Sequence, residues 1–452
     1  MRRGIDNPRK HSNEHLQDYV GFLRQSIMRR IFFPVFISIF LCISVFGFAM
    51  ELTFSLDTQF NTDFFHGQRN DSPPIPKGIE EILMDSLAAI RDQRMDVALR
   101  RMETLIETHP EFRLAQLIYG DLLLSKSRPI TSVGNYPDAP PDKILGLREE
   151  ARQRFKHHRY FPSSAALPEY LVRLPEESGR VVVVDIGKSR LYLYESRGRE
   201  IRLRGNYYVS VGKNGFPKRS KGDKKTPIGV YVTTDSIPPN TLPDRYGLGA
   251  FPLDYPNEWD RRFGRTGDGI WIHGVPKDTY SRTPRASNGC VAVANADLLS
   301  MKDALATPNT PVILARDVSW IEQEEMILRR DRFERRFNRW RRNWENSDHV
   351  GYAEYYSRDF RNETENRESW LLRQKQFADA RDRKIEIGVS NLGIFGYPDE
   401  HKMLVVTFDQ DYRSGSFKVR GKKSQYWRQE KDRQGKGDIW RIVYENTPHP
   451  IQ

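Results

Sequence analysis

The chain has 452 residues, which is long enough for two or three domains with cores of their own. Hydrophobic residues make up 38% of the sequence and charged residues 29%, a balance typical of globular domains on the polar side. The formal net charge of +12 would ordinarily suggest a nucleic-acid partner, but the first fifty residues argue against that function.

An apolar segment, residues 31–49, dominates the N-terminus. It has no charged residue and is about as long as a helix that crosses a membrane. Helices of soluble domains rarely lack a polar face, so a buried core helix is the weaker interpretation. Arg29 and Arg30 precede the segment, and positive flanks stay cytoplasmic. We therefore expect residues 1–50 to be a basic cytoplasmic segment and a signal peptide or retained membrane anchor, with Met28 as an alternative start.

This segment predicts that the rest of the chain is exported to the periplasm. Residues 51–77 are polar and rich in proline, as expected of a linker. Residues 78–126 show the spacing of three helices, part of which resembles a tetratricopeptide-type hairpin. A single hairpin seldom buries a core alone, so we favour a small helical module that packs on its neighbour over one that binds envelope proteins. Residues 127–167 are interpreted as a connector.

Residues 168–320 are predicted to form a β-rich domain. Strands are expected at 181–184, 191–194, 201–211 and 228–234, mostly antiparallel. Later in the same domain we expect a helix over 295–306 and a closing strand over 311–314. The glycine-containing loop 212–225 lacks the Gly-Lys-Ser/Thr ending and the following helix of a phosphate-binding loop, so it does not indicate nucleotide binding.

A histidine and a cysteine carry the candidate chemistry of this domain. His273 and Cys290 are the only residues of their kinds between about residues 168 and 321. A thiol attacks a carbonyl as its thiolate, and imidazole is the base suited to generating it near neutral pH. The other cysteine, Cys42, lies in the apolar segment, so the exported part has one thiol and forms no internal disulfide. No second histidine or cysteine stands at ligand spacing, so we predict no metal and no cofactor.

The residues around Cys290 suit an acyl-transfer site. The turn Ser287, Asn288, Gly289 would let backbone amides converge on a developing oxyanion, and Asn288 and Gly289 both tolerate a positive φ. A helix starting soon after Cys290 would favour the thiolate through its positive end. Arg285 is placed to edge the entrance of the site.

These residues resemble the L,D-transpeptidase catalytic domain, the YkuD family, over roughly residues 165 to 320. The matching positions are His273, Gly274, Ser287, Gly289, Cys290, Val291 and Asn295, with Lys225 to Gly229 as the family's Thr-Pro-x-Gly strand entry. The resemblance implies Cys290 and His273 as catalytic residues. The candidate oxyanion or substrate-positioning residues are the matched Gly274, Ser287 and Gly289, together with Asn288 from the turn and Arg285 from the loop. Ala292 departs from the pattern, because most members carry an arginine on the active-site wall there.

Residues 321–452 are predicted to form an α+β domain that begins with a basic helix over 322–344. The helix has Ile327, Phe333, Phe337, Trp340 and Trp344 on its inner side. Four strands follow, beginning near residues 385, 403, 417 and 439. The order resembles the cone-shaped nuclear-transport-factor-like domain behind some L,D-transpeptidases, and its aromatic sheet either holds a peptide or braces the enzyme.

The sequence as a whole predicts a multidomain α+β protein that acts on peptidoglycan stem peptides. The favoured function is an L,D-transpeptidase that crosslinks tetrapeptide stems through a cysteine acyl-enzyme. The first alternative is an L,D-carboxypeptidase that trims the tetrapeptide to a tripeptide, since Ala292 and the appended domain resemble the cell-shape L,D-carboxypeptidases. The second is a non-catalytic envelope scaffold. A papain-type protease is disfavoured because its cysteine precedes its histidine.

Overall fold

The computed structural model describes residues 78–134, 140–159, 162, 166–379, 384–400, 402–432, 437–446 and 449–450. The predicted apolar segment 31–49 and the linker 51–77 lie outside these residues. Across the described ranges, every helix is too short or too polar to span a membrane. The chain divides near residue 155 into two compact units, which are described separately.

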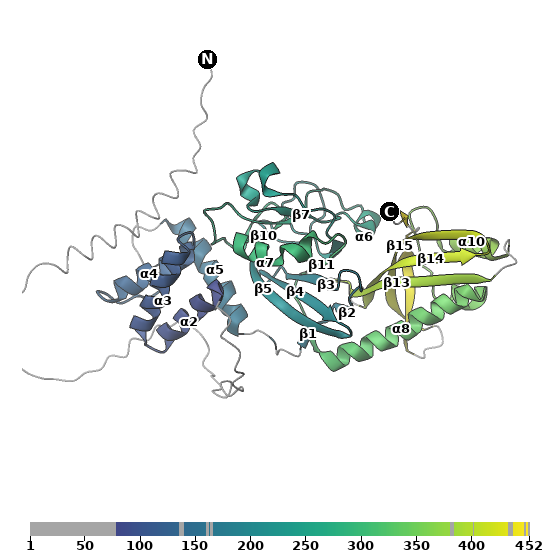
Figure 1. Ribbon diagram of the computed structural model, residues 1–452, viewed down its shortest axis with the longest axis horizontal. Coiled ribbons are helices and arrows are strands. Elements are labelled where there is room, and N and C mark those ends of the chain that lie inside the picture. Colours follow the sequence, from purple (N-terminus) through teal and green to yellow (C-terminus); the bar gives the residue numbers. More distant parts are fainter. Residues whose placement is uncertain are drawn as a thin grey trace, which may run out of the picture. The chain divides into compact units, whose positions relative to one another are not determined.

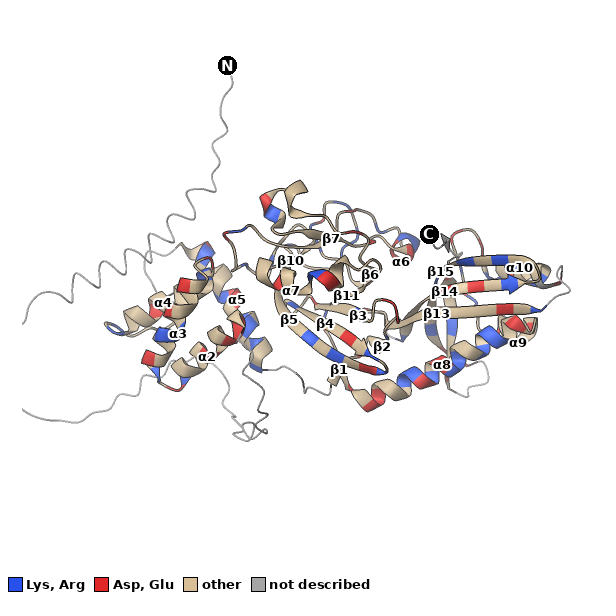
Figure 2. Cartoon of the chain, in the orientation of Figure 1, with Lys and Arg blue, Asp and Glu red and all other residues tan. Residues whose placement is uncertain are grey.

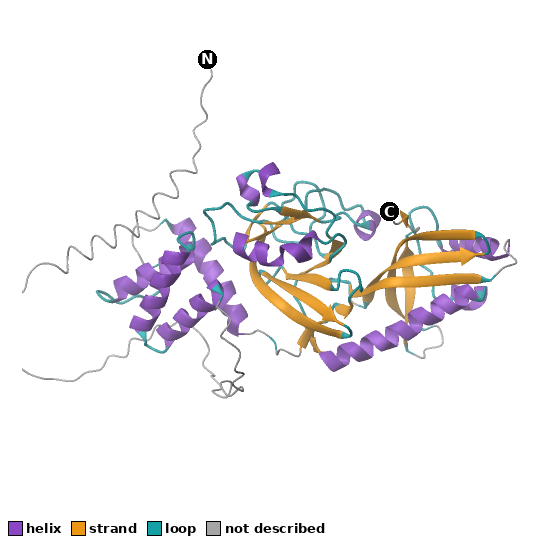
Figure 3. Cartoon of the chain, in the orientation of Figure 1, coloured by secondary structure: helices purple, strands orange, loops and turns teal. Residues whose placement is uncertain are grey.

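The first unit is helical (Figures 1 and 3). Its helices are α2 (Ile79–Arg91), α3 (Met95–Thr108), α4 (Arg113–Ser125) and α5 (Pro141–Arg159). The first three confirm the helices predicted over 78–126, and α4 is buried on most sides because it is apolar nearly all round. α5, from the predicted connector, joins this unit through Arg154, which is 2% exposed and pairs with Glu150 at 2.9 Å and Glu80 at 3.4 Å.

The second unit begins with a β-rich region that matches the predicted strands. Its elements are β1 (Ala166–Pro168), β2 (Leu171–Arg173), β3 (Arg180–Asp185), β4 (Arg190–Arg197), β5 (Glu200–Gly212), β6 (Gly229–Val232), β7 (Ala250–Pro252), α6 (Glu258–Arg262), β8 (Trp271–His273), β9 (Arg285–Ser287), β10 (Val291–Val293), α7 (Asn295–Ala306), β11 (Pro311–Ala315) and β12 (Trp320–Glu322). Among the described residues the main sheet has nine strands in the order β6-β11-β3-β4-β5-β10-β8-β7, with β9 beside β5.

The centre of this sheet is buried on both faces. On β4, Tyr192 and Tyr194 point into one hydrophobic core, and Leu191 and Leu193 point into another. The alternation therefore confirms the predicted strand, since neighbouring side chains face opposite sides. The sequence pattern alone did not show that both sides are covered.

The C-terminal region places a long helix against a curved sheet (Figure 1). Its elements are α8 (Gln323–Glu345), α9 (His349–Ala353), α10 (Arg367–Asp379), β13 (Ile385–Gly396), β14 (Met403–Ser414), β15 (Phe417–Lys431), β16 (Asp438–Glu445) and β17 (His449–Pro450). In Figure 2, Lys and Arg residues recur along α8. Phe333, Phe337 and Trp340 are buried as predicted, but Ile327 is 37% exposed, because Met326 takes the inward position at that turn.

The β-rich and C-terminal regions share one hydrophobic core. β2 pairs with β13 and so becomes an edge strand of the C-terminal sheet. Trp259 of α6 stacks on Tyr426 with ring centroids 4.9 Å apart, and Arg262 donates to the carbonyl of Val443 at 3.0 Å. The tyrosine face of β4 belongs to the same core. Most aromatic residues of the C-terminal sheet are thus buried in this core and not exposed on a concave surface.

A buried ion pair lies inside the C-terminal sheet. Lys423 and Glu445 are 3% and 0% exposed and contact each other directly. Tyr356 and Gln425 donate to the second oxygen of Glu445 at 2.8 and 3.0 Å, and the ammonium of Lys423 lies 4.9 Å from the ring centroid of Trp344. Removing one partner would leave the other charge buried and uncompensated.

We expect Glu445→Gln to lower the free energy of unfolding by about 3–5 kcal/mol, as broken buried pairs commonly do. Chemical denaturation of the purified protein measures this change. The matched control is Glu386→Gln, which breaks the exposed pair with Lys384; there we expect a change of less than about 1 kcal/mol. Equal effects at the two sites would contradict this account of the buried pair.

Candidate active site

Two short parallel strands bring the candidate nucleophile and base together. β10 pairs with β8 in a register that sets Ala292 opposite His273 and Val291 opposite Ile272. Paired residues share a face of the sheet, and alternate residues share it along each strand. Because Ile272 and Val291 point into the core, Ala292 and His273 lie on the other face. Cys290 comes directly before β10, and the same alternation places it on the side of Ala292 and His273, although sixteen residues of chain lie between His273 and Cys290.

His273 is buried and fixed by its own neighbour. Its Nδ1 lies 2.6 Å from the carbonyl oxygen of Gly274. A carbonyl only accepts, so Nδ1 carries the proton and Nε2 is left as the acceptor. The ring also packs edge-on against Tyr246, with centroids 5.0 Å apart. The backbone of Gly274 is therefore the group that orients the imidazole, a role that the sequence left unassigned.

Burial keeps this imidazole neutral. It lowers the pKa of His273 to about 4, and the charges of Arg282 and Arg245 act in the same direction, against the opposing hydrogen bond to Gly274. At neutral pH its Nε2 therefore carries no proton and can accept one.

Cys290 stands immediately before β10 and is partly exposed. Its thiol donates to the carbonyl of Gly269 at 3.2 Å. Burial raises the pKa of the Cys290 thiol, while the backbone amide of Trp271 and the charges of Arg282 and Lys218 oppose that rise. The expectation of a thiolate favoured by a helix N-terminus is wrong for the resting site, because α7 begins only after β10 and burial outweighs the nearby charges.

A hydrogen-bonded turn presents the cysteine. The hydroxyl of Ser287 donates to the carbonyl of Cys290 at 2.6 Å and accepts from the amide of Gly289 at 3.1 Å. Thr226, which is fully buried, donates to the carbonyl of Gly289 at 3.0 Å and accepts from the amide of Gly212 at 2.9 Å. Thr226 thus ties the turn to the end of β5. The sequence alone did not assign Thr226 a role, although the Thr-Pro motif that contains it marked the position.

The remaining turn residues differ in what they contribute. Gly289 has φ +126°, and a Cβ there would lie 2.8 Å from the carbonyl of Lys225, so only glycine fits. Asn288 is exposed and does not adopt the positive φ that we considered for it. Arg285 is also exposed, on β9. The amide of Gly289 is already bonded to Ser287, so it is not one of the free donors predicted to face an oxyanion.

Asn295, at the start of α7, holds the loop after His273. Its side-chain amide donates to the carbonyl of Val275 at 2.8 Å, and its oxygen accepts from the amides of Leu248 and Val275 at 3.1 and 3.2 Å. A Cβ on Gly274 would lie 2.3 Å from that oxygen. Glycine at 274 therefore lets the side chain of Asn295 lie close to the backbone next to His273.

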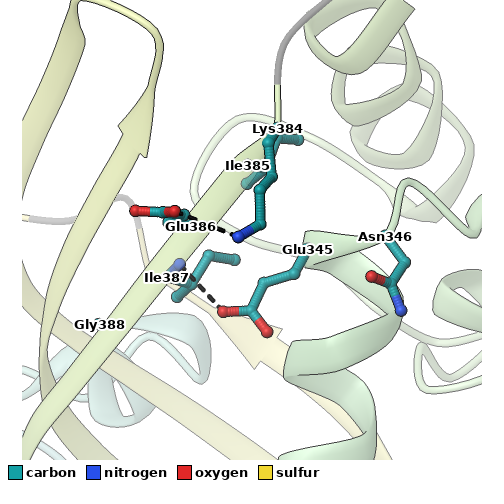
Figure 4. A pocket seen from close by; sticks show the side chains of 7 residues that line it. All are labelled: Glu345, Asn346, Lys384, Ile385, Glu386, Ile387 and Gly388. Carbon is teal, nitrogen blue, oxygen red and sulfur yellow. Dashed lines mark hydrogen bonds and ion pairs between the residues drawn. The ribbon is translucent and has the colours of Figure 1, made fainter.

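Two other features of the structure bear on cofactors and ligands. Within the described ranges, no cluster of three His, Cys, Asp or Glu side chains is arranged to hold a metal ion. A separate cavity lies at the end of α8, lined by Glu345, Asn346 and residues 384–388 (Figure 4). Glu345 accepts from the amide of Ile387 at 3.1 Å, and Lys384 pairs with Glu386 at 3.3 Å. This cavity contains no nucleophile, and we assign it no chemistry.

Comparisons with known proteins confirm both predicted domain families. Residues 179–314 match the L,D-transpeptidase catalytic domain (YkuD), and residues 332–446 match the Cds6 C-terminal NTF2-like domain. Over 121 residues the chain is 32% identical to YafK of Escherichia coli (strain K12), which is named for the L,D-transpeptidases. That match covers 26% of this chain and 44% of YafK, so the chain spans less than half of that relative.

The chain is also similar to two solved structures. Bd1075 of Bdellovibrio bacteriovorus aligns with a TM-score of 0.54 and 28% identity over 64% of this chain and 100% of that chain. The helical cell shape determining protein Pgp2 of Campylobacter jejuni aligns with a TM-score of 0.49 and 25% identity over 65% of this chain and 99% of that chain.

The depressed pKa of His273 predicts how stability varies with pH. The folded state binds this proton less readily than the unfolded chain, so the contribution is present above pH 6.5 and is lost as the pH falls through about 4. We expect the difference in unfolding free energy between wild type and His273→Gln to shrink by about 3 kcal/mol over that range. Denaturant titrations at several pH values measure it; a difference that does not vary with pH would contradict the assignment.

Thr226→Val keeps the shape of the side chain but removes both hydrogen bonds to the nucleophile turn. Because a buried amide and a buried carbonyl lose their partner, we expect the free energy of unfolding to fall by about 1–3 kcal/mol. The control is Thr241→Val on the surface, with a change within about 0.5 kcal/mol. Indistinguishable midpoints for the two variants would show that Thr226 does not hold the turn.

Proposed function

We propose that this chain, with its L,D-transpeptidase catalytic domain followed by an NTF2-like domain, is a cysteine acyl-transfer enzyme of peptidoglycan. The carrying observation is the β8–β10 register, which sets Cys290 and His273 on one face of the sheet. The substrate proposed is a tetrapeptide stem, and the bond broken joins an L-centre to the terminal D-residue. Such a substrate places the enzyme in the cell envelope, in agreement with the export predicted from residues 31–49.

The first step is attack by Cys290 on the carbonyl of that bond. His273 Nε2 accepts the thiol proton as the sulfur–carbon bond forms, and then gives the proton to the leaving amine as the carbon–nitrogen bond breaks. The terminal D-residue leaves and the tripeptide remains as a thioester. A neutral imidazole beside a neutral thiol suits this sequence, because the proton moves during attack rather than before it.

Oxyanion stabilisation is assigned to the turn from Ser287 to Cys290. The hydroxyl of Ser287 accepts from the amide of Gly289 and donates to the carbonyl of Cys290. These two hydrogen bonds fix the backbone of the turn. The amide of Gly289 already donates to Ser287 within the turn. We therefore assign the hydrogen bonds to the oxyanion to the other backbone amides of the turn. Preorganised donors of this kind are worth several kcal/mol in acyl transfer.

The second step depends on which acceptor reaches the thioester, and Ala292 favours water. This residue is buried directly opposite His273, where most family members carry an arginine on the site wall. With no cation at that position, the wall has lost a group suited to an acceptor stem, which carries carboxylates. We therefore propose L,D-carboxypeptidase activity that leaves a tripeptide.

Transfer to an amine of a second stem is the other candidate, and it would give a crosslink. The match of residues 179–314 to the L,D-transpeptidase catalytic domain supports it. Both reactions use the same thioester and the same two residues. In either case the NTF2-like domain braces the enzyme, because the two domains share a hydrophobic core. A non-catalytic scaffold is the weaker proposal, because it would not need both Cys290 and His273.

The deciding experiment is mass analysis of disaccharide tetrapeptide incubated with the full chain, with Cys290→Ala as the matched control. We expect the wild type to release the terminal D-residue and leave tripeptide monomer. We expect Cys290→Ala to lose at least about 1,000-fold of the rate, because no other described group supplies the nucleophile.

Each outcome of this experiment has one meaning. Tripeptide monomer alone supports hydrolysis, and a tripeptide-containing crosslinked dimer supports transfer instead. Untouched tetrapeptide with a folded wild-type protein would overturn the proposed activity and favour the scaffold. Equal turnover by wild type and Cys290→Ala would remove Cys290 from the mechanism.

A further inference from the structure

We propose that Arg282 binds the free terminal carboxylate of the stem peptide, so that the enzyme selects stems whose last residue is neither amidated nor crosslinked. This inference rests on the proposed function, because it specifies which substrate the Cys290 site accepts. It gives Arg282, in the loop between β8 and β9, the role of a specificity-determining residue.

The loop holds Arg282 firmly against the β5 strand. The hydroxyl of Tyr208 donates to the carbonyl of Arg282 at 2.8 Å, and the amide of Val211 donates to the carbonyl of Pro284 at 2.8 Å. The hydroxyl of Ser210 accepts from the amide of Ala286 at 3.2 Å. These three contacts fix the backbone at the arginine and at the residues that follow it before any ligand arrives.

The guanidinium of Arg282 lies at the nucleophile turn. Its Nη2 donates to the carbonyl of Ala286 at 3.3 Å, immediately before Ser287, whose hydroxyl bonds to the carbonyl of Cys290. Its charge acts on both His273 and Cys290. Arg282 thus bonds to the residue before the turn, and its charge acts on the thiol and the imidazole from outside the two strands that carry them.

The same guanidinium is short of partners. Its Nε is buried without a hydrogen-bond partner. Burial lowers the pKa of Arg282, and the groups that oppose this are Cys290 and Tyr208 rather than a carboxylate. Among the described residues, none offers it the acidic partner that a buried guanidinium normally has. A carboxylate brought by the substrate would supply it.

The chemistry of the substrate puts a carboxylate at this place. Three bonds separate the attacked carbonyl carbon from the carboxylate carbon of the terminal D-residue. A cation that binds this carboxylate therefore has to lie beside the thiol. Arginine also matches a carboxylate with two parallel hydrogen bonds, which fixes the orientation of the scissile bond.

Neighbouring cations are less suited to this role. Lys218 is buried and already paired with Asp223 at 2.9 Å. Arg245 is exposed and lies over the ring of Tyr246, 4.8 Å from its centroid. Arg285, the residue that the sequence suggested at the entrance, is exposed on β9. Of these basic residues, Arg282 alone combines partial burial, with a buried Nε, and a lack of acidic partners.

The test measures binding in the inactive Cys290→Ala background, so that it does not depend on turnover. Calorimetry compares disaccharide tetrapeptide with the same compound carrying a C-terminal primary amide. We expect the carboxylate form to bind about 10- to 100-fold more tightly. Adding Arg282→Ala should reduce this ratio to below about threefold, mainly by weakening the carboxylate form. Arg282→Lys should fall between, and the control Arg285→Ala should keep the full ratio.

The outcomes separate this inference from the proposed activity. A carboxylate preference that survives Arg282→Ala, or a loss of affinity that is equal for both ligands, would overturn the role of Arg282. So would a Cys290→Ala protein that binds the two ligands equally. If the preference behaves as expected but the wild type leaves tetrapeptide uncleaved, the binding role stands and the proposed catalytic function falls.

Discussion

The candidate site depends on the parallel pairing of β8 and β10, two strands of three residues each. Their register sets Ala292 opposite His273, and a slip of one residue would turn Cys290 and His273 to opposite faces. Strands this short do not specify a register by themselves, so other contacts have to do so. β10 is also paired with β5, Thr226 ties the nucleophile turn to the end of β5, and Asn295 clamps the chain after His273.

Burial is the second constraint, and it decides the charge state of the site. A nearby imidazole and a helix N-terminus would favour a thiolate in an open site. Here burial raises the pKa of Cys290 against the opposing charges of Arg282 and Lys218, and burial and the charges of Arg282 and Arg245 together lower the pKa of His273. The resting pair is therefore neutral. In the proposed mechanism it becomes charged only when a substrate carbonyl is attacked.

The C-terminal region gives this arrangement a stable support. A single hydrophobic core runs from the tyrosine face of β4 to α8 and the C-terminal sheet, and β2 extends that sheet from the other side. Trp259 and Arg262 of α6 add stacking and hydrogen bonds across the same boundary. Because protein interiors are closely packed, two regions that share a core move together. The NTF2-like domain therefore acts as part of the body of the enzyme.

Local patterns in the sequence determined much of this protein. A valine run located β3, alternation located β4 and the starts of the C-terminal strands, helix-like stretches located α7 and α8, and scarcity singled out His273 and Cys290. These signals are local because strand and helix periodicities are properties of consecutive residues. Tertiary structure alone decided that Gly274 orients His273, that Thr226 and Asn295 hold the turns, and that Arg282 bonds to Ala286, the residue before the nucleophile turn. Each of these depends on contacts between residues distant in the chain, and on burial, which no local pattern contains.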